Sequence, residues 1–197
     1  MSKKMVKLGI TGGIGSGKSY VAAMLVKMGV PVYDTDAHAK RLMLEDDGIR
    51  ADLIALLGKD VYLDGQLNKP KLAKYLFASR ENAERINHIV HPRVYRDFLA
   101  WAEADVTHSV MAMESAILFE ANFETAVDYV LMVYAPLEIR LTRAMDRDHA
   151  SREQILSRMQ AQMDDEEKRK RSDFIVVNDG QADLTSQLNK IFRILTR

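Results

Sequence analysis

Cysteine is absent from this chain of 197 residues. Without it the protein has no disulfides, no thiolate nucleophile and no zinc–thiolate site. Any metal must therefore bind through oxygen or imidazole ligands. The absence is compatible with a reducing compartment, and it leaves the kind of chemistry open.

An excess of charge of one sign is also missing, because 28 Lys and Arg residues balance 28 Asp and Glu residues. Proteins whose main partner is nucleic acid or an anionic membrane usually carry a strong positive field. We therefore expect no nucleic-acid partner and no membrane partner. The composition does not indicate an oligomeric state, and a monomer is among the alternatives left open.

Long hydrophobic runs are missing as well. The longest ones, such as residues 129–136, fall short of the ~20 residues that a membrane-spanning helix needs. Lys7 and the glycines after it interrupt anything like the apolar stretch of a signal peptide. We expect a cytoplasmic protein, and the chain length fits one compact domain with appendages.

The apolar segments predict an α/β fold. Short apolar or β-branched strands are expected near residues 6–11, 30–33, 109–113, 129–134 and 174–177, with helical spacing between most of them. Strands that alternate with helices predict a parallel sheet flanked by helices. The carboxyl ends of such strands meet at one edge, where ligands bind.

Two further regions have a mostly helical pattern. Residues 49–101 show helical spacing interrupted by glycines and prolines. A helix over residues 151–163 is predicted to begin with a capping box at Ser151 and Gln154. The run 164–171 pairs acids with bases at i,i+4, which is typical of a solvated helix face, and we assign it no chemistry.

A glycine-rich loop carries the clearest functional signal. Residues 12–19 satisfy G-x-x-x-x-G-K-[ST] between a predicted strand and a predicted helix, which is the context this motif requires. Its backbone N–H groups would bind phosphate oxygens, Lys18 would reach the β- and γ-phosphates of ATP, and Ser19 would coordinate Mg²⁺. The residues expected to contact the nucleotide are Gly13, Ile14, Gly15, Ser16, Gly17, Lys18, Ser19 and Tyr20.

Other interpretations of the loop fit less well. A dinucleotide-binding turn, G-x-G-x-x-G, would need its third glycine at Lys18 or Tyr20. A GTPase needs N-K-x-D, and the nearest stretch, residues 68–71, ends in a cation where the guanine-binding acid should be. A turn without a ligand is disfavoured because Lys18 and Ser19 are both in register. An ATP-using phosphotransferase is favoured.

Two carboxylates follow the second predicted strand. Asp34 and Asp36 are expected at the mouth of the sheet, facing the phosphate loop. A kinase needs a group that orients the acceptor hydroxyl and accepts its proton, and Asp34 is the candidate for this base. Helix capping is an equally good explanation of Asp36 and a weaker one for Asp34.

Two arginines lie four residues apart on a predicted helix. Arg143 and Arg147 therefore share a face and could clamp the transferring phosphate. The alternative is solvent exposure, with Asp146 or Asp148 as surface partners of little energetic weight. Spacing alone does not decide between the two interpretations.

Together these motifs resemble the dephospho-coenzyme A kinase family, and the match extends nearly from end to end. The features that carry the resemblance are Thr11 to Ser19, Asp34-Thr35-Asp36, His91-Pro92, Ile117-Leu118-Phe119-Glu120, Arg143, Arg147-Asp148, Arg158, Gln162, and Asp173 through Asn178-Asp179-Gly180.

The resemblance implies ATP-dependent phosphorylation of the ribose 3′-hydroxyl of dephospho-CoA, giving CoA and ADP. It also implies a P-loop NTPase-type nucleotide-binding core from residues 1–48, 102–142 and 172–197. A helical region for the CoA substrate would occupy residues 49–101, and a helical lid would occupy residues 143–171.

The same resemblance assigns roles to single residues. Asp34 would be the catalytic base and would bind the acceptor, and His91 and Glu120 would line the acceptor site. Arg143 and Arg147 would act on the transferring phosphate together with the lysine of the loop. Without the family, His91 and Glu120 would be read as a polar residue ending a helix and as a surface acid.

The chain departs from the family pattern at three positions. Tyr20 replaces a Thr after the loop, Ala116 replaces a Pro, and Thr35 lies between the two carboxylates. These changes bear on substrate geometry and leave the catalytic side chains in place. The alternatives are another P-loop small-molecule kinase, such as a nucleoside monophosphate kinase, and a nucleotide-sensing module without phosphotransfer.

Overall fold

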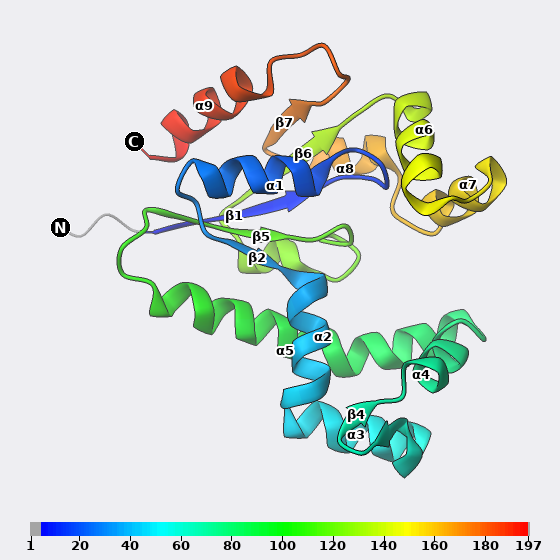
Figure 1. Ribbon diagram of the computed structural model, residues 1–197. Helices are drawn as coiled ribbons and strands as arrows, with labels where there is room; N and C mark the ends of the chain where they lie inside the picture. Colours follow the sequence, from blue (N-terminus) through cyan, green and yellow to red (C-terminus); the bar gives the residue numbers. More distant parts are fainter. Residues whose placement is uncertain (1–4, 197) are drawn as a thin grey trace. The chain divides into compact units, whose positions relative to one another are not determined.

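The computed structural model describes residues 5–196, and contacts divide the chain into two compact units (Figure 1). The core unit consists of the chain up to Asp34 and from Ala102 onward, and the helical unit consists of Thr35–Trp101. The helical unit thus begins at Thr35, earlier than the start at residue 49 expected for the insertion. The roles expected for these regions stay predictions.

A five-stranded sheet organises the core unit. Its order is β2-β5-β1-β6-β7, and every neighbouring pair is parallel. The predicted parallel α/β architecture is confirmed. The strands are β1 (Val6–Thr11), β2 (Val32–Asp34), β5 (Val110–Glu114), β6 (Tyr129–Tyr134) and β7 (Phe174–Val177).

The central strands are apolar along nearly their whole length because a parallel sheet is covered on both faces. All five residues of β5 are buried, and so are the four middle residues of β6. Helices α1 (Lys18–Lys27) and α9 (Leu184–Leu195) cover the same face of the sheet (Figure 1). They share one core with the strands, to which Leu25 and Leu188 contribute.

A second, smaller core joins helices α6 (Leu137–Asp148) and α7 (Arg152–Gln160). Ile14 of the phosphate loop packs against this core, so the loop is fixed to these helices. The capping box at Ser151 and Gln154 is present as predicted.

The helix predicted over residues 151–163 ends earlier, at Gln160. A separate short helix, α8 (Asp165–Arg171), begins after Asp164, whose side chain accepts the N–H groups of Glu166 and Glu167. An N-cap within the charged run therefore divides the region into two helices. A short 3₁₀ segment, η2 (Phe123–Ala126), precedes β6.

The helical unit is built around four helices. Pro92, predicted to interrupt the helical pattern, lies inside helix α5, which spans Arg80–Ala104. The buried side chains of Val90, Val94 and Phe98 hold that helix together around the proline. The elements are α2 (Thr35–Glu45), α3 (Asp47–Leu57), η1 (Lys59–Val61), β3 (Tyr62–Leu63), β4 (Gln66–Leu67), α4 (Lys69–Leu76) and α5 (Arg80–Ala104).

Ion pairs fix the packing within the helical unit. Arg93 of α5 contacts Asp52 at 2.7 Å, and Arg41 of α2 contacts Asp97 at 2.7 Å. Helix α2 begins at Thr35, so Asp36 lies in its first turn rather than before it. Across residues 5–196, none of the helices combines the length and the apolar character that crossing a membrane requires.

Candidate active site

The glycine-rich loop connects β1 to α1 in a tight, partly left-handed path. Gly15 and Gly17 have φ angles of 79° and 86°, where a side chain would be strained. The N–H of Ser16 donates to the carbonyl of Gly13 at 3.0 Å and closes a turn. Helix α1 then begins at Lys18 without a side-chain cap. Its first N–H groups and the loop together form an anion-binding end.

Neighbouring residues pack closely against the glycines of the loop. A Cβ atom at Gly13 would overlap the guanidinium of Arg140 and the carboxylate of Asp165. One at Gly15 would overlap the backbone carbonyl of Arg140, and one at Gly17 would overlap the amide of Asn178. The glycines are therefore required by packing as well as by phosphate chemistry.

The side chains of Lys18 and Ser19 at the end of the loop both meet one carboxylate. Lys18 Nζ and Ser19 Oγ each lie 2.7 Å from Glu114 Oε1, at the end of β5. Glu114 is buried, with 8% of its surface exposed. Glu114 is not among the site residues predicted from the sequence, although an acid directly after the apolar run 109–113 is a signal for one.

Asp34 lies beside this cluster on the neighbouring strand. It is the last residue of β2 and is paired in register with Glu114. Adjacent strands are ~4.8 Å apart, and paired residues of parallel strands point to the same face. Asp34 is exposed, so a ligand can reach it. Asp34 and the phosphate loop therefore lie at the same edge of the sheet.

Arg143 belongs to the surroundings of the loop. Its Nη1 donates to the backbone carbonyl of Asn178 at 3.0 Å. The side-chain amide of Asn178 in turn donates to the carbonyl of Ser16 at 2.8 Å. Asn178 thus links the arginine to the loop.

Arg147, one helical turn further along, has different neighbours. Its guanidinium forms two hydrogen bonds to Asp148, of 2.7 and 3.1 Å. Asp148 also accepts from Arg158 at 3.0 Å. These hydrogen bonds raise the pKa of Arg147 and lower that of Asp148. The structure places Arg147 in an exposed ion pair, which was the alternative interpretation of its spacing.

Glu120 ties the segment after β5 to the start of α8. Its Oε1 accepts from the N–H of Met163 at 2.8 Å and lies 3.0 Å from Lys168 Nζ. Lys168 is fully buried and also donates to the carbonyl of Ala116 at 2.8 Å. The prediction that the run 164–171 is only a solvated face is therefore wrong at Lys168, which faces inward. A buried amine needs such oxygen partners.

His91 lies in α5 of the helical unit and is partly buried. Burial lowers its pKa below the ordinary value of 6.5, and the nearby His88 lowers it further. Both effects disfavour the charged ring. His91 is therefore neutral at neutral pH and can both donate and accept a hydrogen bond.

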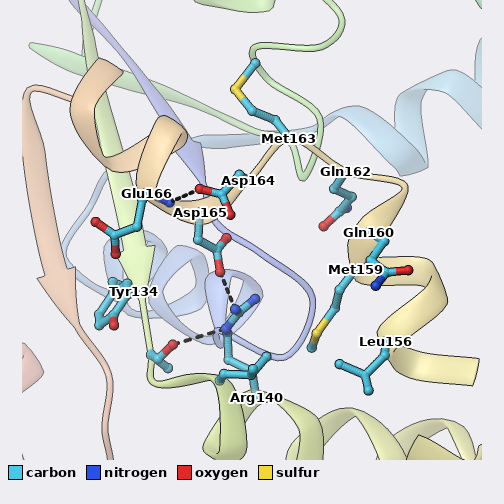
Figure 2. A pocket seen from close by; sticks show the side chains of 12 residues that line it. Tyr134, Arg140, Leu156, Met159, Gln160, Gln162, Met163, Asp164, Asp165 and Glu166 are labelled. Carbon is cyan, nitrogen blue, oxygen red and sulfur yellow. Dashed lines mark hydrogen bonds and ion pairs between the residues drawn. The ribbon is translucent and has the colours of Figure 1, made fainter. Parts of the chain in front are cut away.

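A pocket of about 530 Å³ lies between the end of β6, helices α6 and α7, and the start of α8 (Figure 2). Arg140 points toward Asp165 at its wall and forms an ion pair with it. Arg140 Nε also donates to the carbonyl of Ala135 at 3.1 Å. None of the site residues selected from the sequence lines this pocket. The Arg140–Asp165 pair instead packs against Gly13 of the phosphate loop.

The fold and the loop together define a class of enzyme. Phosphoryl transfer from a nucleoside triphosphate needs a cradle for the phosphates, a cation close to them and an acid beside the acceptor. One edge of the core unit carries the glycine-rich loop, Lys18 and the exposed carboxylate Asp34, at a position where open α/β sheets bind ligands. The chain is a P-loop kinase.

Comparison with known proteins gives the family. The family model described as dephospho-CoA kinase matches residues 6–183. A dephospho-CoA kinase of Bacteroides fragilis is 48% identical over 190 residues, which cover 96% of this chain and 93% of that protein. One of Porphyromonas gingivalis is 44% identical over 158 residues, which cover 80% and 78%. The chain belongs to the dephospho-CoA kinase family, and ATP is its phosphoryl donor.

Solved structures agree with this fold. TT1252 from Thermus thermophilus matches with a TM-score of 0.84 and 35% identity, and 98% of each chain is covered. A dephospho-CoA kinase from Campylobacter jejuni matches with a TM-score of 0.70 over 96% of each chain. Its identity is 22%, so it supports the fold alone.

The Arg140–Asp165 pair yields a first prediction. The two side chains are only 10% and 15% exposed, so Asp165→Asn leaves a buried guanidinium without its counter-charge. We expect the free energy of unfolding to fall by about 3 kcal/mol and the Kd for ATP to rise several-fold as the loop loosens. Chemical denaturation and titration calorimetry measure the two effects.

Two variants serve as controls for that experiment. Glu166→Gln makes the same charge change on the same helix at an exposed side chain and should leave both quantities near wild type. Arg140→Gln combined with Asp165→Asn removes both charges and should recover most of the stability. ATP binding by Asp165→Asn as tight as in wild type would show that the loop does not need the pair.

His91 yields a prediction about pH. Because its pKa is lowered in the folded state, the unfolded chain binds more protons below pH 6.5. We expect the stability contributed by the neutral ring to be complete above pH 6.5 and to be lost as the pH falls below that value. Urea melts between pH 5 and 7.5, followed by the fluorescence of Trp101, measure this loss; His91→Gln should reduce the pH dependence. A ring pKa above 6.5 by NMR would contradict it.

Proposed function

We propose that this protein transfers the γ-phosphoryl group of ATP to the 3′-hydroxyl of the ribose of dephospho-CoA, giving CoA and ADP. The observation that carries the proposal is the pairing of Asp34 with Glu114, the residue that holds Lys18 and Ser19. An exposed acid thus lies next to the γ-phosphate end of a phosphate loop. Membership of the family supports the choice of acceptor.

In this proposal Asp34 orients the 3′-hydroxyl and accepts its proton while the oxygen bonds to the γ-phosphorus. The bond between the γ-phosphorus and the bridging oxygen of ADP breaks in line. Lys18 and the loop N–H groups stabilise the charge on the phosphate oxygens. Arg143, held beside the loop through Asn178, adds a second cation.

Ser19 is the residue proposed to hold Mg²⁺, together with phosphate oxygens. No cluster of three or more His, Asp or Glu side chains within residues 5–196 forms a metal site of its own. A single hydroxyl ligand from the protein, with further ligands from the phosphates of the nucleotide, fits the way kinases bind Mg²⁺. When bound, the ion neutralises charge on the β- and γ-phosphates. Glu114 keeps the Ser19 hydroxyl oriented.

The remaining roles are proposals based on the family resemblance. Residues 49–101 would bind the CoA substrate, with His91 on the acceptor side, and residues 143–171 would form a lid. Glu120, which holds the start of α8, would position that lid as well as line the acceptor site. Arg147 would join the phosphates only after leaving Asp148. We retain a cytoplasmic location as part of the proposal.

Product analysis tests the proposed reaction. Purified protein with ATP and dephospho-CoA should form CoA and ADP in equal amounts, measured by mass spectrometry. Adenosine monophosphate and cytidine monophosphate are offered in parallel as acceptors. ADP formed only with a nucleoside monophosphate, and no CoA, would replace the proposal by a nucleotide kinase.

Asp34→Asn tests the base. The amide cannot accept the proton, so kcat should fall by roughly 10²–10⁴-fold, while the Kd for ATP stays within about twofold. Asp146→Asn makes the same chemical change at an exposed residue of α6 and should behave as wild type. Substantial turnover by Asp34→Asn would remove Asp34 from its role.

A further inference from the structure

Glu114 carries a buried negative charge next to the phosphate loop. It is the last residue of β5, and its side chain is 10% exposed. The loop binds anions through its N–H groups, its lysine and the start of α1. A fixed carboxylate at this position therefore repels the group that the loop binds. The proposed mechanism uses Glu114 only to orient Ser19, and this repulsion stays without a task.

Lys18 is the counter-ion of this carboxylate. Its Nζ lies 2.7 Å from Glu114 Oε1, and its side chain is 16% exposed. A buried acid that loses its partner is strongly disfavoured, because the protein replaces little of the water that the charge has given up. The same amine has to bind the phosphates of ATP. A single positive charge cannot offset both the carboxylate and a triphosphate.

The hydroxyl of Ser19 indicates which group completes the balance of charge. It donates to Glu114 Oε1 at 2.7 Å. A serine hydroxyl has one proton and two acceptor lone pairs, so Glu114 takes the proton and the lone pairs stay available to a cation. Mg²⁺ binds oxygen ligands of this kind together with phosphate oxygens. The donor set therefore fits a cation that arrives with the nucleotide.

We propose that Glu114 makes the binding of ATP depend on the divalent cation, so that this kinase selects ATP complexed with Mg²⁺ over the free nucleotide. The proposal rests on the proposed function only in placing Mg²⁺ at Ser19. Free ATP has to share Lys18 with Glu114 and lies close to a buried anion. A doubly charged ion at Ser19 offsets the carboxylate and the phosphates together. Glu114 thus determines specificity through its charge.

A purely structural anchor is the alternative role for Glu114. Its hydrogen bonds to Lys18 and Ser19 hold the first turn of α1 in either case. The two roles predict effects of opposite sign. If the carboxylate only anchors these side chains, its removal weakens the binding of ATP with or without the cation. If it repels free nucleotide, its removal strengthens the binding of ATP alone.

Titration calorimetry on the full chain separates the two roles. ATP is titrated into wild type and Glu114→Gln, once with MgCl₂ and once with EDTA, and no acceptor is present. Glutamine keeps the length of the side chain and an oxygen that accepts from Lys18 and Ser19, but it has no charge. We expect wild type to bind ATP roughly 100-fold more tightly with Mg²⁺, and the variant to reduce this ratio to about tenfold or less. The change should come from free ATP, which should bind the variant roughly tenfold more tightly than wild type.

Two further variants complete the experiment. Glu138→Gln makes the same change of charge in the core unit, at a side chain that is 69% exposed, and should leave both Kd values at those of wild type. Glu114→Asp keeps the charge and shortens the side chain, so it should retain the preference for the complexed nucleotide.

Two results would overturn the proposal. One is a wild-type Kd for ATP that is the same with MgCl₂ and with EDTA, which needs no variant. The other is free ATP that binds Glu114→Gln no more tightly than wild type. Absence of CoA formation in the product assay would instead overturn the proposed acceptor and would leave these binding constants unaffected.

Discussion

The parallel pairing of β1 with β5 and β6 is the interaction on which the rest of the site depends. It brings the carboxyl ends of these strands to one edge, so that the loop after β1 meets Glu114 of β5. The pairing of β2 with β5 then places Asp34 next to Glu114. Because side chains alternate along a strand, a shift of one residue in β5 would turn Glu114 away from Lys18. The register of the backbone hydrogen bonds between the strands thus determines which side chains meet at this edge of the sheet.

Much of the fold and part of the site could be predicted because their signals are local. The strands follow from short apolar runs, the loop from its spacing, and Asp34 from its position at a strand end. Glu114 and Asp165 were missed for a different reason. Glu114 meets Lys18 across 96 residues of chain, and Asp165 of α8 meets Arg140 of α6 in a fold in which α8 packs on β6. Sequence spacing carries no information about such contacts.

The charged run at α8 shows how a correct local pattern can mislead. Acids and bases four residues apart share a helix face, but the pattern does not tell which face packs against the sheet. Lys168 faces inward. There, the carboxylate of Glu120 and the carbonyl of Ala116 take the place of the water molecules that would solvate an exposed ammonium group. The inward cation fixes the start of α8, and α8 supplies Asp165 to support the phosphate loop. A run predicted to be a solvated helix face thus contributes a residue, Asp165, that packs against the phosphate loop.

The packing against Gly13, Gly15 and Gly17 bears on how this sequence can evolve. A descendant that lost the need for nucleotide would still lack room for a side chain at these positions, since Arg140, Asp165 and Asn178 fill the space. Selection for folding alone would then preserve the glycines of the motif. Lys18 and Ser19 are held by hydrogen bonds to Glu114 and not by this steric restriction. In a descendant that no longer binds phosphate, we therefore expect the first substitutions at Lys18 and Ser19, while the three glycines stay unchanged.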